Sequence, residues 1–162
     1  MKRVLIIGCP GTGKSTLARA LATVTNLPLY HLDLIWHKSD RSTITRAELC
    51  ERLAAILPTE EWIIDGNYAA TLDLRLKYAD TVILLDMPTE VALLGARSRL
   101  GKVREDIPWQ EDELDAEFEK RIRSFNTEIL PAMRERLKDF EGQLTVLHSR
   151  DEIKDFLKGL GS

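Results

Sequence analysis

Short apolar runs alternate with longer segments of mixed polar and apolar residues along the chain. The runs are rich in Val, Ile and Leu and lack strict alternation, which is typical of parallel strands covered on both faces. Segments with helix-start signals lie between them, so we predict an α/β fold: a three-layer sandwich whose five-stranded parallel sheet has helices on both faces. The five predicted strands are 3–7, 29–32, 61–65, 81–86 and 144–148.

Two helix starts have the sequence of a capping box, in which side chains at the first turn satisfy otherwise unpaired N–H groups. Thr45 with Glu48 is the first, and Ser149 with Glu152 repeats the pattern near the C-terminus. Both follow a break in the apolar pattern, so we expect a helix to begin at each site.

A long polar segment, 110–140, is predicted to be helical, with Pro131 either kinking it or splitting it in two. Residues 100–110 before it are the best candidate for a short mobile lid. No low-complexity linker or internal repeat interrupts the sequence, so we interpret residues 1–162 as one domain.

Residues 8–15 read Gly-Cys-Pro-Gly-Thr-Gly-Lys-Ser, which fits the phosphate-loop pattern G-x-x-x-x-G-K-[ST] in full. The loop follows a predicted strand and opens a predicted helix, 15–24, so its N–H groups and the helix N-terminus form an anion site. Lys14 is expected to reach the β- and γ-phosphates of ATP, and the Ser15 hydroxyl to ligate Mg²⁺. Residues expected to bind the nucleotide are Gly8, Cys9, Pro10, Gly11, Thr12, Gly13, Lys14, Ser15 and Thr16.

Cys9 has two interpretations. Nearby N–H groups can lower the pKa of a thiol and make it reactive. The favoured interpretation is a small packing residue, because the x positions of the loop accept many residue types.

The phosphate loop alone does not separate kinases, GTPases and motor ATPases. The N-K-x-D motif that reads guanine in GTPases is absent from the sequence, and the small size favours a kinase over a motor ATPase. Two predicted strands end in an acid, Asp65 and Asp86. In a sheet of order 2-3-1-4-5, Asp65 emerges beside the phosphate loop, so we favour it as the residue that holds Mg²⁺. Helix capping is sufficient to explain Asp86.

Asp33 follows the second predicted strand and is expected at the carboxyl edge of the sheet, where α/β proteins bind ligands. It could accept a hydrogen bond from a substrate hydroxyl or take its proton. The alternative is a surface acid beside a packed Trp36. His31 and His37 lack metal-ligand spacing and are interpreted as packing or surface residues.

Basic residues lie in and around the proposed lid: Arg97 and Arg99 precede it, Lys102 and Arg104 lie within it, and Arg121 and Arg123 follow. Arginines that close over transferring phosphates stabilise the transition state. The alternative is pairing with the acids of 105–119 on a solvated face.

Four groups of residues together resemble the bacterial family known as DNA topology modulation proteins (FlaR-related), a branch of the adenylate-kinase-like P-loop kinases. They are Gly8–Ser15, His31-Leu32-Asp33 with Trp36, Trp62-Ile63-Ile64-Asp65-Gly66-Asn67-Tyr68, and Arg75 before Ala79-Asp80-Thr81. The resemblance is specific over residues 1–100 and weaker between 100 and 140.

The resemblance implies a P-loop NTPase fold that binds ATP and Mg²⁺. It implies that an acceptor pocket is lined by Asp33, Trp36, Asn67, Tyr68 and Arg75. It also implies a nucleotide-binding role for Arg97 and catalytic roles for Arg121 and Arg123.

Composition narrows the remaining classes. The net charge of −3 over 162 residues argues against a dedicated nucleic-acid binder, and we find no helix-turn-helix, zinc knuckle or basic stripe. The two cysteines do not form a disulfide framework. Neither a signal peptide nor a membrane span is recognisable, so we expect a cytoplasmic protein.

The prediction is a kinase that moves the ATP γ-phosphate to a small acceptor, with a nucleotide among the candidates. Lys14, Ser15, Asp65 and the lid arginines would carry the transfer, and Asp33 would position or deprotonate the acceptor. Arg41, Arg46 and Arg75 could neutralise a phosphorylated acceptor. The alternatives are a kinase for a non-nucleotide metabolite, similar to shikimate or gluconate kinases, and a nucleotide-binding regulator linked to DNA topology with little transfer activity.

Overall fold

The structure, a computed structural model, describes residues 1–161. Within this range no helix combines the length and the apolar character needed to cross a membrane. The strands are β1 (Arg3–Gly8), β2 (Leu29–His31), β3 (Trp62–Asp65), β4 (Thr81–Leu85) and β5 (Gln143–Leu147). The helices are α1 (Lys14–Thr25), α2 (Leu32–Trp36), α3 (Arg46–Ile56), α4 (Ala69–Leu76), α5 (Thr89–Ser98), α6 (Ala116–Ser124), the π-helix η1 (Phe125–Ile129), α7 (Leu130–Leu137) and α8 (Arg150–Leu160).

All the strands pair in parallel in one sheet of order β2-β3-β1-β4-β5, which confirms the predicted fold class. The central strand β1 lies between β3 and β4, with Leu5 opposite Ile64 on one side and Val82 on the other. Each predicted run overlaps its strand, and their ends differ by one residue at most.

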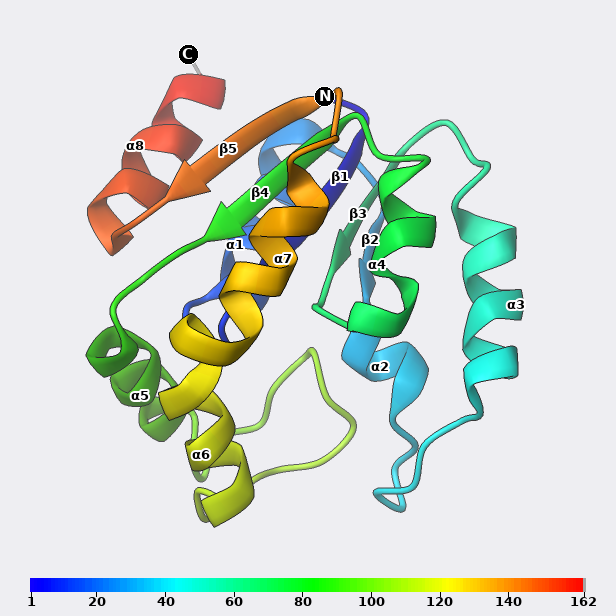
Figure 1. Ribbon diagram of the computed structural model, residues 1–162. Coiled ribbons are helices and arrows are strands. Elements are labelled where there is room, and N and C mark those ends of the chain that lie inside the picture. The colour runs from blue at the N-terminus through cyan, green and yellow to red at the C-terminus, as the bar shows by residue number, and fades with distance from the viewer. Residues whose placement is uncertain (162) are drawn as a thin grey trace.

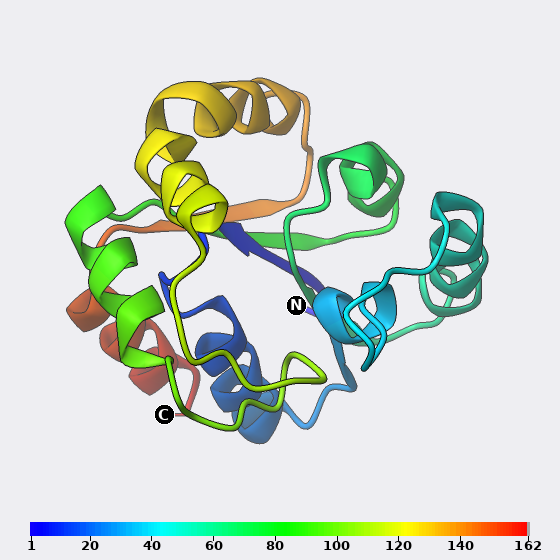
Figure 2. The same cartoon turned by 90° about the horizontal axis from the view of Figure 1, so that it is seen from below.

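Alternate residues of each strand pack on opposite faces, which divides the core into two clusters. Val4 and Ile6 of β1 pack with α1 and α8, whereas Leu5 and Ile7 pack in the cluster that includes α3, α4 and α7. The two helical layers are visible on either side of the sheet in Figure 2. Because both faces are covered, every residue of β4 is buried and apolar runs replace strict alternation.

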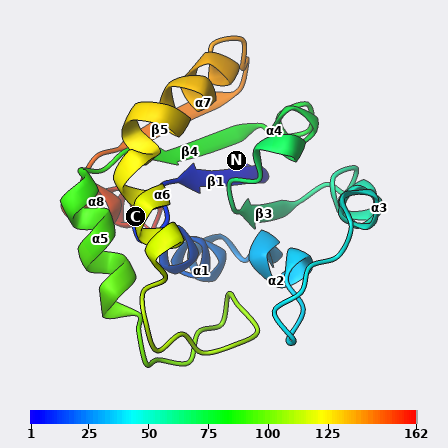
Figure 3. The ribbon, with the colours of Figure 1, turned by 60° about the horizontal axis from the view of Figure 1, so that its bottom comes forward.

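The carboxyl ends of the strands meet at one edge of the sheet. The phosphate loop follows β1 at this edge, α2 follows β2, and the segment that leads to α4 follows β3. A loop of residues 99–115 between α5 and α6 crosses in front of this edge toward α2 (Figure 3). The proposed lid, 100–110, lies within this loop.

Helix starts follow the sequence signals closely, with one difference. Thr45 forms the full capping box with Glu48 at α3. At α8, Ser149 Oγ accepts from the N–H of Glu152 at 3.1 Å, but the Glu152 carboxylate accepts from the N–H of His148 at 2.6 Å. The second box is therefore only half formed.

The prediction of helix over 110–140 is wrong at its start. Residues 110–115 belong to the loop, and α6 begins after Asp115, whose carboxylate accepts from the N–H of Glu117 at 2.7 Å. A capping acid satisfies the free amides at the first turn, so the helix begins there. The break that Pro131 predicted is present: η1 lies directly before α7, and Pro131 lies in the first turn of α7, where its missing N–H costs little.

The phosphate loop packs directly against α5 through two glycines. Gly11 has φ +85°, and a Cβ at this position would collide with the carbonyl oxygen of Ala92. A Cβ at Gly95 of α5 would in turn collide with the carbonyl oxygen of Gly11. The absence of side chains at both positions lets the backbones touch.

We expect Gly95→Ala to lower the free energy of unfolding by about 1–3 kcal/mol because of this overpacking, although Ala is otherwise the better helix former. Gly159→Ala is the matched control, since no atom lies within 4 Å of its added Cβ; it should be neutral or stabilising by up to about 1 kcal/mol. Urea unfolding measures both. Equal stability of the Gly95→Ala variant and the wild type would contradict the close packing.

Candidate functional site

The phosphate loop leaves its helix N-terminus open. Gly11 and Gly13 have φ values of +85° and +99°, which L-residues rarely adopt. Gly13 occupies the N-cap of α1 and has no side chain, so no side-chain oxygen caps the first amides of the helix. This arrangement suits an anion such as a phosphate group.

Side chains from inside and outside the loop bind its carbonyl groups. Lys14 Nζ donates to the carbonyls of Gly8 at 2.9 Å and Cys9 at 3.1 Å. Asn67 exchanges two hydrogen bonds with the backbone of Gly8, at 2.9 and 2.6 Å. Arg150, the first residue of α8, donates to the carbonyl of Thr12 at 2.8 Å and to that of Gly11. These bonds fix the loop. The Gly8 amide is taken by Asn67, whereas the first amides of α1 have no side-chain cap and are left to a ligand.

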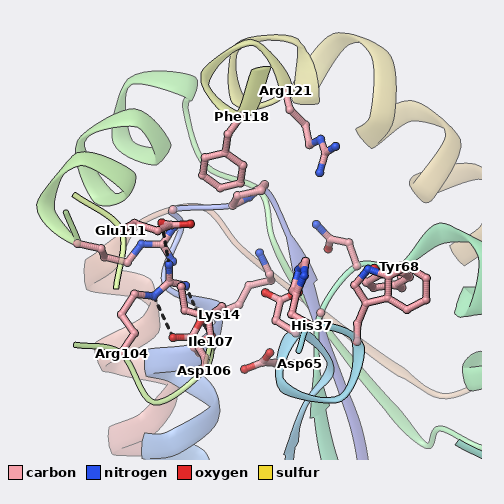
Figure 4. Close-up of a pocket in the computed structure, with 18 of the residues that line it drawn as sticks. Lys14, His37, Asp65, Tyr68, Arg104, Asp106, Ile107, Glu111, Phe118 and Arg121 are labelled. Carbon is pink, nitrogen blue, oxygen red and sulfur yellow. Dashed lines mark hydrogen bonds and ion pairs between the residues drawn. The ribbon is translucent and has the colours of Figure 1, made fainter. Parts of the chain in front are cut away.

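A cavity of about 850 Å³ opens above the loop at the carboxyl edge of the sheet (Figure 4). Residues from β3, α1, α2, α6 and the 99–115 loop contribute to its wall. Predicted site residues that line it are Pro10, Gly11, Gly13, Lys14, Ser15, Asp33, Trp36, Asp65, Asn67, Tyr68 and Arg121. The structure thus brings most of the predicted site together.

Burial lowers the pKa of Lys14, and the carboxylates of Asp65 and Asp33 partly offset this effect. The surrounding carboxylates therefore do not fully compensate the ammonium group for its lost hydration. A bound phosphate would supply that compensation.

Asp65 ends β3 and is buried against His31, the last residue of β2. The His31 Nδ1 and the Asp65 Oδ2 are 2.5 Å apart. Burial lowers the pKa of His31, but the hydrogen bond and charge of Asp65 outweigh it, so the pKa lies above its ordinary value. His31 is therefore a partner of the proposed Mg²⁺ residue, a role that its interpretation as a packing residue did not include.

A chain of polar contacts joins the 99–115 loop to the phosphate loop. Ser15 Oγ donates to Asp106 Oδ2 at 3.0 Å, and Arg104 binds the same carboxylate through Nε at 3.0 Å and Nη2 at 2.5 Å. Burial raises the pKa of Asp106, but Arg104 and Ser15 outweigh it, so this carboxyl titrates below its ordinary range. The Ser15 hydroxyl and the carboxylates of Asp65 and Asp106 are oxygen donors of the kind that Mg²⁺ prefers.

Asp33 lies in the first turn of α2 and lines the cavity rather than the outer surface. Burial raises its pKa, and the positive charge of Lys14 lowers it in part. Trp36, one turn further, meets Tyr68 edge to face at 4.7 Å between ring centroids. A carboxylate and two aromatic rings therefore form one wall of the cavity.

The predicted arginines divide into two groups. Arg121 lines the cavity and extends into it from α6 (Figure 4), as do Arg99 and Arg104 from the 99–115 loop. Arg97 and Arg123 do not line it: both donate to Glu119 Oε1, at 2.8 and 3.0 Å. The predicted site roles of Arg97 and Arg123 therefore stay predictions: in this structure both side chains turn toward the half-buried Glu119.

The prediction that Arg75 lines the acceptor pocket is wrong. Its side chain is fully buried and donates to Thr71 Oγ1 at 3.1 Å and to the carbonyls of Gly66, Asn67 and Tyr68. The guanidinium thus holds the backbone between β3 and α4 and is unable to reach a substrate. The side-chain amide of Asn67 likewise holds the phosphate loop.

Four of the residues predicted to bind the nucleotide at the phosphate loop do not line the cavity: Gly8, Cys9, Thr12 and Thr16. Cys9 is buried, and burial raises its pKa to about 11. This agrees with its interpretation as a small packing residue. Thr12 is buried and donates to the carbonyl of Cys9 at 2.6 Å, whereas Thr16 lies on the exposed face of α1.

Sequence reasoning missed three contributors. Asp106 and Trp109 lie in an irregular loop, where no periodicity shows which residues turn inward. Arg150 contacts the phosphate loop from the far end of the chain. Its position directly after the last predicted strand was the available signal, because that strand end also lies at the ligand-binding edge.

The family described as "ATPase family associated with various cellular activities (AAA)" matches residues 4–59, which contain the phosphate loop. No curated protein matches the chain.

Solved kinases share the fold over nearly the whole chain. A shikimate kinase from Acinetobacter baumannii, in complex with shikimate, is 18% identical with a TM-score of 0.63, covering 99% of this chain and 90% of its own. A deoxyadenosine kinase from M. mycoides is 15% identical with a TM-score of 0.61 and 97% coverage of both chains. A gluconokinase from Sinorhizobium meliloti is 17% identical with a TM-score of 0.53, covering 98% and 91%. At these identities the comparison shows a P-loop kinase-like fold.

Replacing Arg75 by Met should lower the free energy of unfolding by at least about 3 kcal/mol, because several buried carbonyls lose their donor. Arg97→Met should cost less than about 1 kcal/mol, since that arginine makes an exposed ion pair. Chemical denaturation measures both variants. A small effect at Arg75 would show that its hydrogen bonds contribute little.

Iodoacetamide at pH 8 should modify Cys50 and leave Cys9 untouched in the folded protein. With a pKa of about 11, roughly 0.1% of Cys9 is thiolate at that pH, and its side chain is buried. Mass spectrometry of the wild type and of Cys50→Ser gives the rates, and unfolded protein is the control in which both cysteines react. Rapid labelling of the folded Cys50→Ser variant would contradict this.

Proposed function

We propose that the protein is an ATP- and Mg²⁺-dependent kinase that transfers the γ-phosphate to a hydroxyl of a small acceptor. The main support for this function is that Lys14 and Ser15 of the phosphate loop line the same cavity as Asp33. A phosphate donor site and a candidate proton acceptor therefore share one enclosed space. The P-loop kinase-like fold supports the proposal.

ATP would lie with its phosphates on the amides of the phosphate loop. Lys14 would exchange its carbonyl partners for phosphate oxygens, and Arg99, Arg104 and Arg121 would neutralise the charge that spreads over the equatorial oxygens. Ser15 would hold Mg²⁺, with Asp65 nearby directly or through water. When bound, the ion would offset the negative charge of the phosphate groups.

Asp33 would act on the acceptor. Its carboxylate would accept the proton of the attacking hydroxyl as the new bond to the γ-phosphorus forms and the bond to the β–γ bridging oxygen breaks, which releases ADP. The raised pKa of Asp33 suits a group that must hold this proton, because a very weak base would not.

The resemblance to the DNA topology modulation proteins supports a more specific membership within the P-loop kinases, and this membership is part of the proposal. The alternative is a nucleotide-binding regulator with little transfer activity, acting in the cytoplasm on a partner or on DNA topology. The two functions differ in acceptor-dependent ADP release.

Lys14→Ala should weaken ATP binding at least tenfold, because it removes a charged donor to the phosphates. Asp33→Asn should bind ATP within about threefold of the wild type and lose transfer by about 10²–10⁴-fold, the usual size of a general-base contribution. Calorimetry measures binding, and a coupled ADP-release assay across nucleosides, nucleotides and polyols measures transfer.

Lys154→Ala is the control for loss of a lysine, since Lys154 pairs with Asp151 on α8 and does not line the cavity. Tight ATP binding without turnover on any acceptor would favour the regulator. Full activity of Asp33→Asn would exclude Asp33 as the base.

A further inference from the structure

The charges around the cavity are unevenly distributed. Among residues 1–161, seven carboxylates line it and the lysine and arginine cations number four. The cations are Lys14, Arg99, Arg104 and Arg121, and the carboxylates are Asp33, Asp65, Asp106, Glu111, Glu113, Asp115 and Glu117. An anionic acceptor would enter a cavity that already has more acids than bases.

Three of the four cations belong to the phosphate end. Lys14 lies against the carbonyls of the phosphate loop, and Arg104 is joined to Ser15 through Asp106. Arg99 is close enough to Lys14 to lower its pKa by charge repulsion. ATP carries several negative charges of its own, so these side chains are committed to the donor.

The three arginines that the sequence suggested for binding an acceptor phosphate do not line the cavity. Arg75 is buried under the β3–α4 segment and binds backbone carbonyls. Arg41 is exposed and lies over the Trp109 ring at 5.6 Å from its centroid. Arg46 is exposed at the first turn of α3 and does not line the cavity. Only Arg121 remains among the cavity cations, and it comes from α6, on the roof opposite Lys14 (Figure 4).

The wall away from the phosphate end is acidic and aromatic. Burial raises the pKa of Tyr68, the negative charge of Asp33 raises it further, and the positive charge of Arg121 lowers it in part. The edge-to-face pair of Trp36 and Tyr68 adjoins this carboxylate, with Ala69 and Ala70 beside it. A phosphate or carboxylate here would meet the Asp33 charge at close range, whereas a neutral hydroxyl would donate to it. Aromatic walls favour a flat ring through stacking and edge contacts.

We propose that the acceptor is an uncharged alcohol that carries a flat ring, with a nucleoside as the representative, and that nucleoside monophosphates and sugar acids are rejected. This inference rests on the proposed kinase function for the reaction, but its recognition step is measured separately. The specificity follows from where the cations lie: the donor occupies three of the four, and the acceptor wall offers Asp33 and aromatic rings.

Calorimetry with the full chain, Mg²⁺ and β,γ-imido-ATP tests the inference without turnover. The titrants are the common ribo- and deoxyribonucleosides, their 5′-monophosphates, shikimate and gluconate. We expect at least one nucleoside to bind tenfold or more tightly than its own monophosphate and than either acid. A monophosphate or acid that binds as tightly as the best nucleoside overturns the proposal, as does the absence of nucleoside binding at millimolar concentration.

Variants of α2 test the aromatic wall. Trp36→Leu should weaken nucleoside binding at least tenfold, and Trp36→Phe should restore most of it, while both bind the ATP analogue as the wild type does. Leu34→Ala is the matched control, because Leu34 lies on the same helix, is 41% exposed and does not line the cavity. Unchanged nucleoside binding in Trp36→Leu would overturn the role of the aromatic wall.

The two proposals fail in different ways. A nucleoside that binds but is never phosphorylated contradicts the kinase function and leaves the acceptor class standing. Turnover of a monophosphate with no turnover of its nucleoside sustains the kinase function and overturns the acceptor class.

Discussion

The phosphate loop binds an anion only if its amides stay free while its carbonyl groups find partners, and the surrounding structure meets this constraint. Lys14, Asn67 and Arg150 donate to carbonyls of the loop from three different elements. Backbone polar groups left without partners are costly in a protein interior, so the loop depends on these donors. Close packing of Gly11 against α5 supports the same segment from another side.

This support continues away from the site. Arg75 holds the carbonyls of the segment between β3 and α4, and the same segment carries Asn67, which holds Gly8. A buried guanidinium thus acts on the phosphate loop through an asparagine. This explains why an arginine in a functional-looking motif lies where no substrate reaches it, and why motif membership alone did not reveal its role.

The 99–115 loop brings both charge signs to the cavity. Arg104 binds Asp106 and Glu111, so its charge is partly neutralised within the loop, and Asp106 reaches Ser15. The loop therefore ties the cavity wall to the phosphate loop through side chains rather than through regular secondary structure. Three of the four cavity cations, Lys14, Arg99 and Arg104, belong to the phosphate end, and the acceptor wall retains the acid Asp33 and aromatic rings.

The sequence by itself determined the strands of the parallel sheet and the location of the phosphate loop, because these depend on local patterns: apolar runs for buried parallel strands, and glycines followed by Lys14 and Ser15 for the loop. Capping chemistry likewise located the start of α3. Only the tertiary structure decided which charged residues face the cavity. Arg97 and Arg121 look alike in sequence, but helix orientation turns the first toward Glu119 and the second into the cavity. The side-chain positions in an irregular loop depend on distant packing, which no local pattern encodes.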